Sequence, residues 1–225
     1  MDKTPVCVGI ILDGNRRWAQ QNGISRLEGH QHGADNLERV TIAARDLGVK
    51  HLVVFAFSTE NWKRTAEEVA KLLDVFGQGI EKYLPQMAAD RVRVRFVGER
   101  ERFSPYLQKA MDGAEKSNPE KYDITLWVCV SYGGRAEIAA AAEAARSAGE
   151  AITEETINKH LWTSKMPDPD IIIRTSGEQR LSGFLTWKSV YSELFFIDKH
   201  WPDFTKEDLE KVLAEYAERE RRMGK

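Results

Sequence analysis

The sequence has little cysteine and no long apolar run. Only two cysteines occur among its 225 residues, too few for a disulfide-stapled scaffold. Cys7 and Cys129 both lie inside apolar stretches, so we expect buried free thiols in a reducing cytoplasm. The apolar run at 6–12 is too short for a signal peptide or a transmembrane helix. The sequence therefore predicts a cytoplasmic protein and leaves peripheral membrane contact open.

Charge of one sign is also missing. The chain carries 33 Lys and Arg against 35 Asp and Glu, a formal charge of −2. No basic field points to nucleic acid as a partner, so any anion site must be built locally. The apolar fraction of 42% and charged fraction of 30% are ordinary for a globular protein and exclude disordered, collagen-like and coiled-coil chains.

The familiar phosphate-binding motifs are absent. We find neither G-x-x-x-x-G-K-[ST] nor G-x-G-x-x-G, which argues against P-loop nucleotide hydrolases and dinucleotide-binding enzymes. Ser176 has no nucleophile-elbow context, so acyl transfer is also disfavoured.

Apolar strand patterns alternate with helical ones along the chain. Strands are predicted at 6–12, 51–57, 92–97, 123–130 and 170–173, and helices over 34–47, 65–89, 135–148 and 209–216, with shorter ones opening at 104 and 153. Such alternation indicates a mostly parallel sheet with helices on both faces. With no linker or repeat, residues 1–225 are predicted to form one α/β domain.

Three strand ends are unusually polar. They carry the segments DGNRRW (13–18), STENWKR (58–64) and RTSGEQRLSGF (174–184). In open α/β sheets, ligands bind beyond the carboxyl ends of the strands. Arginines outnumber acids in these segments, and guanidinium groups bind phosphate oxygens in pairs. The alternative, solvated surface charge, suits a single arginine better than three clusters.

Two residues of the first segment favour phosphate chemistry further. Gly14 lets backbone N–H groups approach an anion. Asp13, a carboxylate among arginines, suits Mg²⁺, which takes one or two carboxylates plus substrate phosphate oxygens. One or two phosphate-bearing substrates are therefore predicted.

Five ordered motifs together resemble the cis-prenyltransferases, the undecaprenyl diphosphate synthase-like isoprenyl transferases. They are DGNRRWA, Gly29-His-Gln-His-Gly33, FSTENWKR, SYGGR, and RTSGEQRLSGFLTW followed by YSELFF. The resemblance implies a homodimer of one α/β domain, with a central, mainly parallel six-stranded sheet that encloses a hydrophobic tunnel. It also implies Mg²⁺-dependent condensation of isopentenyl diphosphate with an allylic diphosphate (farnesyl, geranyl or dimethylallyl) to a Z-polyprenyl diphosphate, with peripheral membrane contact for product release.

The resemblance assigns roles to individual residues. Asp13 and Asn61 are implied as catalytic, and Asp13 and Glu193 as metal ligands. Substrate contact is implied for Gly14, Asn15, Arg16, Arg17, Trp18, Arg26, His30, Ser58, Thr59, Glu60, Trp62 and Arg64 at the first two segments. It is also implied for Arg174, Arg180, Leu181, Ser182, Arg222 and Gly224. An amide is a poor base, so Asn61 is expected to position a proton relay rather than hold the proton.

Some assignments leave alternatives open. Trp18 and Trp62 either wall the reacting centre or pack in the core. Arg222-Met-Gly224 either reaches the partner's diphosphate site or is a basic helix end. Arg16 stands where glycine is common in the family, and Gln179 and Gly183 also depart from its pattern.

Product length and activity carry rival readings too. The candidates for the tunnel floor are Phe55, Phe76 and Trp127, which ordinary core packing explains equally well. The 65–89 helix lacks the insertion that is associated with very long products, so products up to the undecaprenyl class are expected. A catalytically silent subunit and an unrelated phosphate-binding α/β domain are the competing hypotheses. The presence of Asp13, Asn61, Arg174, Arg180 and Glu193 disfavours the silent subunit.

Overall fold

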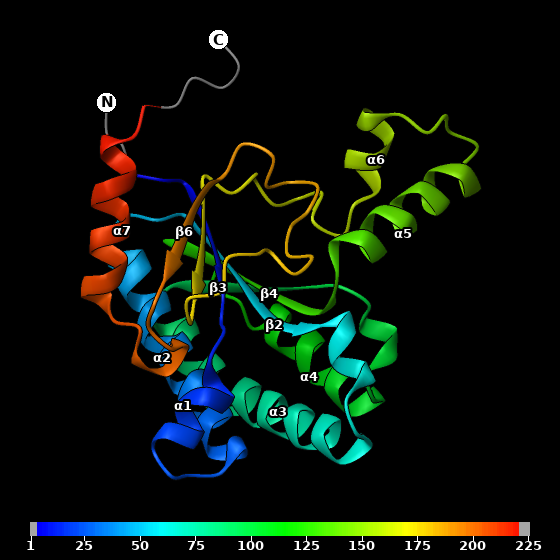
Figure 1. Cartoon of the computed structure of the whole chain (residues 1–225). Helices are drawn as coiled ribbons and strands as arrows, with labels where there is room; N and C mark the ends of the chain where they lie inside the picture. Colours follow the sequence, from blue (N-terminus) through cyan, green and yellow to red (C-terminus); the bar gives the residue numbers. More distant parts are fainter. Residues whose placement is uncertain (1–3, 221–225) are drawn as a thin grey trace.

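Six strands form one sheet, in which every neighbouring pair runs parallel (Figure 1). A computed structural model describes residues 4–220. The strands are β1 (Cys7–Ile11), β2 (His51–Ser58), β3 (Val92–Val97), β4 (Ile124–Tyr132), β5 (Ile171–Thr175) and β6 (Glu193–Ile197), in the spatial order β3-β4-β2-β1-β5-β6. Parallel neighbours require crossover connections, and helices supply most of them. The predicted fold class is confirmed.

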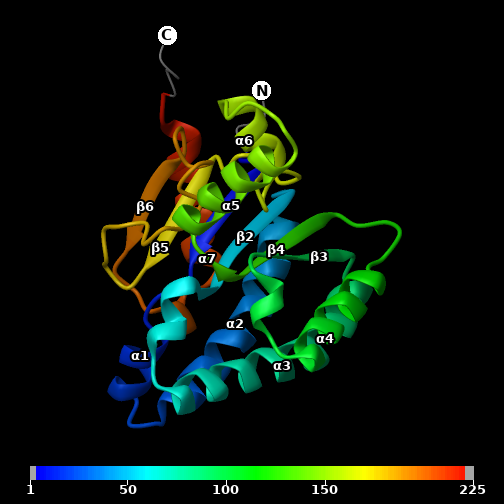
Figure 2. The same ribbon diagram turned by 90° about the vertical axis from the view of Figure 1, so that its right-hand side faces the viewer.

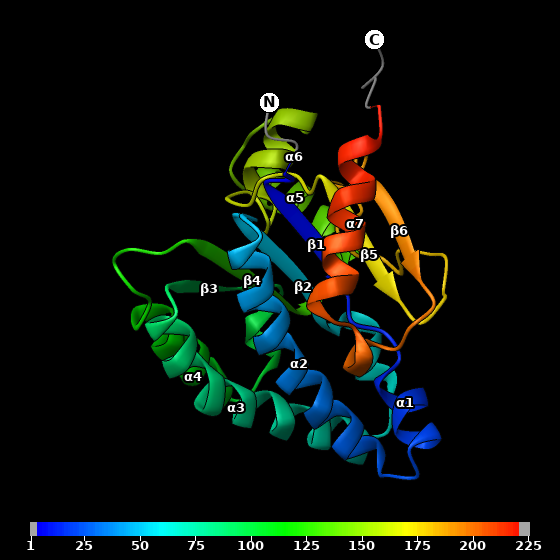
Figure 3. The same cartoon turned by 90° about the vertical axis from the view of Figure 1, so that its left-hand side faces the viewer.

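Helices cover both faces of the sheet. They are α1 (Asn15–Gln21), α2 (Arg26–Asp46), α3 (Ala66–Ala89), α4 (Pro105–Lys116), α5 (Gly134–Ser147), α6 (Glu154–His160) and α7 (Lys206–Glu218), with short 3₁₀ segments η1 (Thr59–Lys63), η2 (Arg100–Arg102) and η3 (Trp201–Asp203). Figure 2 shows α5 and α6 in front of the strands, and Figure 3 shows α2 and α7 in front of them. The sheet therefore forms the middle layer.

Alternating side chains of the strands feed two cores. On β1, Val8 and Ile10 join the larger core with α2, α3, α4 and α7, while Cys7 and Ile11 join the core on the other face. Cys7 and Cys129 are buried and free, as predicted. Burial raises the pKa of both thiols, so neither is a reactive thiolate.

Local sequence signals set the ends of the two long helices beside the site. Ser25 and Glu28 form a reciprocal capping box at the start of α2, and Gly48 follows its end with φ +87°, a conformation that favours glycine. The Thr65 hydroxyl accepts from the backbone N–H of Glu68 at the start of α3. The end of α2 and both ends of α3 lie within a residue or two of the prediction, whereas α2 begins at Arg26, eight residues before the predicted start at 34. Its first two turns carry two glycines and few apolar residues, so helical periodicity did not mark them. No helix among the described residues is both long and apolar enough to cross a membrane.

The carboxyl ends of β1, β2 and β5 meet at one edge of the sheet. Ile11 is in register with Phe55 on one side and with Arg174 on the other. The three polar segments that follow these strands are therefore neighbours, as predicted from the sequence. No sequence pattern marked β6, because its short apolar run follows a long connection without a helix.

Candidate active site

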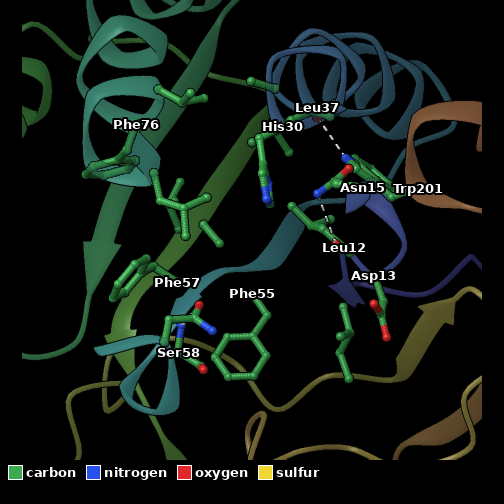
Figure 4. A pocket seen from close by; sticks show the side chains of 18 of the residues that line it. Leu12, Asp13, Asn15, His30, Leu37, Phe55, Phe57, Ser58, Phe76 and Trp201 are labelled. Atoms are coloured by element: carbon green, nitrogen blue, oxygen red, sulfur yellow. Dashed lines mark hydrogen bonds between the residues drawn. The ribbon is translucent and has the colours of Figure 1, made fainter. Parts of the chain in front are cut away.

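A cavity of about 1440 Å³ opens at this edge. In Figure 4, Phe57 and Phe76 lie on one side of it, and His30, Asn15 and Asp13 on the other. Its apolar wall includes Leu37 of α2, Leu72, Leu73, Phe76, Ile80 and Met87 of α3, and Leu126 and Val128 of β4. Its polar wall comes from the loops after β1, β2 and β5. One end can hold anions and the other a hydrocarbon chain.

The three aromatic candidates for the tunnel floor separate in the structure. Phe55 and Phe76 line the cavity. Trp127 packs in the core on the opposite face of the sheet, because its neighbours Leu126 and Val128 point to the cavity and strand side chains alternate. Of the two alternatives left open for Trp127, the ordinary core residue is the one that holds.

Asp13 lies at the centre of the polar end, two residues beyond β1. Its Oδ2 is 2.8 Å from Arg174 Nη2, and its Oδ1 is 3.3 Å from Arg17 Nη2. Its backbone oxygen accepts from Thr175 Oγ1 at 2.7 Å and from the N–H of Trp201 at 3.0 Å. The side chain is 28% exposed, so the backbone of Asp13 is fixed by hydrogen bonds while part of its carboxylate stays accessible to a ligand.

Two glycines let α2 pass close to α1. A Cβ on Gly29 would lie 2.5 Å from the backbone oxygen of Asn15, and one on Gly33 would lie 2.4 Å from Asn15 Oδ1. The Nδ2 of Asn15 donates to Leu12 O at 3.5 Å (Figure 4). Its Oδ1 is buried without a partner. The Gly29-His-Gln-His-Gly33 motif therefore brings His30 and Asn15 into one wall.

Cations outnumber anions on this wall. Arg16 and Arg26 share one carboxylate, that of Glu68, at 3.2 and 3.7 Å. The Nη1 of Arg64 is buried and has no partner. Burial, and then the charge of Arg16, lower the pKa of Arg64. An anion bound here would relieve that repulsion.

His30 is neutral in this setting. Burial, followed by the charges of Arg64 and Arg16, lowers its pKa to about 4. A neutral imidazole can donate one hydrogen bond and accept another at neutral pH. It therefore adds a polar contact beside the arginines without adding charge.

The segment after β2 adds smaller polar groups. Ser58, Thr59, Glu60 and Asn61 all line the cavity. The Oδ1 of Asn61 accepts from the backbone N–H of Ser58 at 3.0 Å. With its oxygen already bound to Ser58, the amide keeps its N–H₂ group for a ligand.

The loop after β5 gathers Arg174, Arg180 and Ser182. Arg174, whose side chain is 5% exposed, donates through Nη1 to Arg180 O at 2.5 Å and to Ser182 Oγ at 2.8 Å, and its Nε is buried without a partner. Glu178 pairs with both Arg180 and Arg17. Arg17 and Arg180 are thus linked by a carboxylate.

Three predicted substrate contacts lie elsewhere. The Nε1 of Trp62 donates to Ser131 Oγ at 2.9 Å, and its ring packs on Phe57 and Phe103. Trp18 stands beside His32, with ring centroids 4.8 Å apart, and Leu181 packs on the second core. None of these three is among the lining residues. The core-packing alternative holds for Trp62.

Glu193 does not approach Asp13 within one chain. It begins β6, in register with Ile171 at the start of β5, whereas Asp13 follows the far end of β1. At roughly 3.3 Å per residue, the two carboxylates are more than about 10 Å apart along the strands. Glu193 instead pairs with Arg219 at 2.7 Å. The expected pair of metal ligands is not formed in one chain.

Across residues 4–220, no group of three or more acidic, histidine or cysteine side chains is arranged to hold a metal ion. Arg222 and Gly224 lie outside the described residues.

The structure also adds residues that the sequence reasoning missed. Arg135 of the SYGGR motif lines the cavity, and its place three residues beyond β4 was the available signal. Glu68 and Glu178 bridge the arginines of the two walls. No sequence pattern identifies such partners, because the contacts depend on how α3 and the β5 loop fold back.

Comparisons with known proteins agree with this arrangement. An isoprenyl transferase of Thermotoga maritima is 46% identical, covering 99% of this chain and 97% of the relative. One of Streptococcus thermophilus is 43% identical, covering 100% and 94%. The structure of lavandulyl diphosphate synthase from Lavandula x intermedia, in complex with dimethylallyl diphosphate, aligns with a TM-score of 0.94 at 34% identity over all of both chains. A family model described as undecaprenyl diphosphate synthase matches residues 11–224. The chain belongs to this family of isoprenyl transferases and is an enzyme that transfers prenyl groups.

Proposed function

We propose that this enzyme uses Mg²⁺ to condense isopentenyl diphosphate with an allylic diphosphate, giving a Z-polyprenyl diphosphate of short to undecaprenyl length. One observation carries the proposal. Within the described part of the chain, three buried side-chain polar atoms lack a partner: Asn15 Oδ1, Arg64 Nη1 and Arg174 Nε. All three belong to residues that line the cavity. Buried polar atoms ordinarily have partners, so the two guanidinium nitrogens await acceptor atoms of a ligand. The oxygen of Asn15, itself an acceptor, lies against Gly33 and adds nothing to the binding of an anion.

Two headgroup positions account for the polar lining. Asn15, Arg16, Arg26, His30 and Arg64 surround the position proposed for the allylic diphosphate. Arg174, Arg180 and Ser182 surround the position proposed for isopentenyl diphosphate. Asp13 lies between them, bonded to Arg174. Anchoring both headgroups holds the two carbon centres in contact, and such orientation supplies much of the rate in a two-substrate reaction.

The donor set fits Mg²⁺ with a phosphate substrate. Asp13 is a partly exposed carboxylate, and Mg²⁺ is commonly held by one or two carboxylates together with substrate phosphates and water. When bound, the ion would neutralise charge on the departing diphosphate. Asp13 would hold it, while Glu193 is too far away in the same chain to join.

The remaining residues manage charge and protons. As the diphosphate leaves, negative charge on its oxygens grows, and Arg16, Arg64 and Arg17 are placed to stabilise it. Asn61 orients its N–H₂ toward the cavity, because its oxygen is bound to Ser58. It therefore positions a ligand oxygen, and the proton released from isopentenyl diphosphate passes to the departing diphosphate.

The apolar wall is proposed as the tunnel for the growing chain. Side chains of α3, α2 and β4 supply the lining, and burial of each methylene is worth about 0.8 kcal/mol. We also infer a homodimer, since β6 is an edge strand with exposed Val190 and Tyr191 near its start, and unpaired edges and apolar patches favour association. Cytoplasmic placement, peripheral membrane contact and a role of Arg222 and Gly224 stay predictions.

A radiolabelled assay tests the proposal. The full chain is incubated with labelled isopentenyl diphosphate and dimethylallyl, geranyl or farnesyl diphosphate, with and without chelator. We expect label in organic-extractable product, lost on chelation and restored by Mg²⁺. Chromatography gives the length and double-bond geometry. No incorporation with any primer at high protein concentration would favour a silent subunit instead.

A further inference from the structure

Ser176 and His200 form a hydrogen bond directly behind Asp13. Ser176 Oγ and His200 Nδ1 are 2.5 Å apart, although they are 24 positions apart in the chain. Ser176 follows β5, and His200 precedes η3. The bond therefore joins the loop after β5, which carries Arg180 and Ser182, to the segment after β6.

The backbone of Ser176 is in the left-handed region. Its φ is +78°, and that of the next residue, Gly177, is +72°. Any residue with a Cβ is strained there, and glycine would not be. The N–H of Ser176 donates to Lys199 O at 2.8 Å, and that of Gly177 to Ile197 O at 3.0 Å. A serine at this strained position contributes what glycine lacks, a hydroxyl for His200.

The pair lies against Gly14. A Cβ on Gly14, whose φ is +107°, would be 2.6 Å from Ser176 Oγ and 2.7 Å from His200 Nδ1. The chain neighbours of the pair, Thr175 and Trp201, both donate to the backbone oxygen of Asp13. The two segments thus grip the Asp13–Gly14 peptide together.

The same turn carries the second headgroup position. Arg174, two residues before Ser176, binds Asp13 and Ser182, and the backbone oxygen of Ser176 accepts from Arg17 Nη1 at 3.4 Å. Arg174 therefore links Asp13 directly to the Arg180–Ser182 loop, and Ser176 lies on the same turn, where its backbone contacts Arg17.

We propose that Ser176 and His200 are a positioning pair, which sets the two headgroup positions relative to each other. The inference rests on the proposed function. Each position keeps its own ligands when the pair is lost, so substrate binding should survive while the reacting carbons lose alignment. Misplacement of about 1 Å can cost about a hundredfold in rate.

Four variants test the pair in the full chain. His200→Leu and Ser176→Ala remove the hydrogen bond, and we expect kcat to fall about tenfold to a hundredfold, with KM for both substrates within about threefold. His200→Asn can place an amide near the Nδ1 position, and should keep kcat within about threefold. Ser176→Gly relieves the strain without restoring the bond, so it should melt above Ser176→Ala and share its low kcat.

Thr153→Ala is the matched control. It removes a hydroxyl that caps α6, at the opposite end of the strands from the cavity (Figure 1). It should lower the melting temperature and leave kcat unchanged. A kcat within twofold of the parent in both His200→Leu and Ser176→Ala would overturn the proposal. So would equal losses in His200→Leu and His200→Asn, or full recovery in Ser176→Gly.

A crystal structure separates this proposal from the function itself. If the parent chain transfers no isoprenyl unit, the proposed function fails, and the structure of His200→Leu still decides the positioning role. We expect residues 176–178 to shift away from Gly14. An unmoved turn would overturn the inference.

Discussion

The two walls of the polar end hold their arginines differently. The first, here named the α1–α2 wall, consists of Arg16, Arg26 and His30 together with Arg64 from the segment after β2. In it, Arg16 and Arg26 share Glu68, and Arg64 keeps a buried nitrogen without a partner. The second, here named the β5-loop wall, has Arg174 bonded to Asp13 and Arg180 bonded to Glu178. The first wall is repulsive when empty, and the second is neutralised by carboxylates of the chain.

The difference predicts different responses to an anion. A diphosphate on the α1–α2 wall relieves repulsion between cations. On the β5-loop wall it must displace or rearrange existing ion pairs. We therefore expect the allylic headgroup to gain more from each arginine than the isopentenyl headgroup does.

The largest expected effect is that of Asp13→Ala, because Asp13 serves both walls. We expect kcat to fall about a thousandfold, as when a main electrostatic group of an active site is removed. Steady-state rates, with circular dichroism to check the fold, measure it. Asp13→Asn, which keeps the shape without the charge, is the control and should be nearly as inactive. Substantial activity in either variant would remove Asp13 from its proposed role.

Arg64→Ala and Arg180→Ala compare the walls directly. Hydrogen bonds to charged groups contribute about 1.5–3 kcal/mol, so Arg64→Ala should raise KM for the allylic substrate about 10- to 150-fold. Arg180 is 59% exposed, and its loss should raise KM for isopentenyl diphosphate about tenfold.

Arg64→Lys is the control for charge without the planar fork, and should fall between Arg64→Ala and the parent. The opposite assignment, with Arg180→Ala acting mainly on the allylic substrate, would exchange the two proposed positions.

His30 should make the stability of the fold depend on pH in the acid range. Its pKa is lowered to about 4 in the fold, against about 6.5 unfolded. Between these values only the unfolded chain binds the proton, so stability should fall as pH drops from about 6.5 to 4, by up to about 3 kcal/mol. It should be unaffected by this group above pH 6.5. Urea unfolding of the parent and His30→Gln at several pH values measures the difference, and parallel pH curves would contradict it.

The smallest effect is expected at Glu178 on the other wall. Glu178→Gln frees Arg17 and Arg180 from a carboxylate, and should lower KM for isopentenyl diphosphate about two- to fivefold, since exposed ion pairs are weak. The gain should shrink at high salt. A raised KM would mean that Glu178 holds the arginines in their binding positions instead of competing with the substrate.

Much of the frame was predictable from local sequence. The cap at Thr65 and the stop at Gly48 mark helix ends, and the apolar runs mark β1, β2 and β4, because these signals act between residues close in the chain. The grouping of Asp13, Ser58 and Arg174 also followed, since parallel strands end at one edge.

The site assignments that the fold does not support depended on which way a side chain points and on how far along its strand it lies. Trp127 was a tunnel candidate, but its strand turns it to the other face. Glu193 was paired with Asp13, but it begins a strand whose far end is near the site. Trp62 sits within a polar segment, yet an aromatic cluster takes its ring. A side chain's type does not reveal which neighbours a twisted sheet brings to it.

The sequence by itself determined the alternation of strands and helices, and the edge at which its arginines collect, because periodicity and strand polarity are properties of the chain. Tertiary structure alone decided which arginine is neutralised, which polar atoms lack a partner, and how Ser176 meets His200 behind Gly14. Those outcomes depend on contacts of a few ångströms between distant segments, and packing of the whole sheet sets such distances.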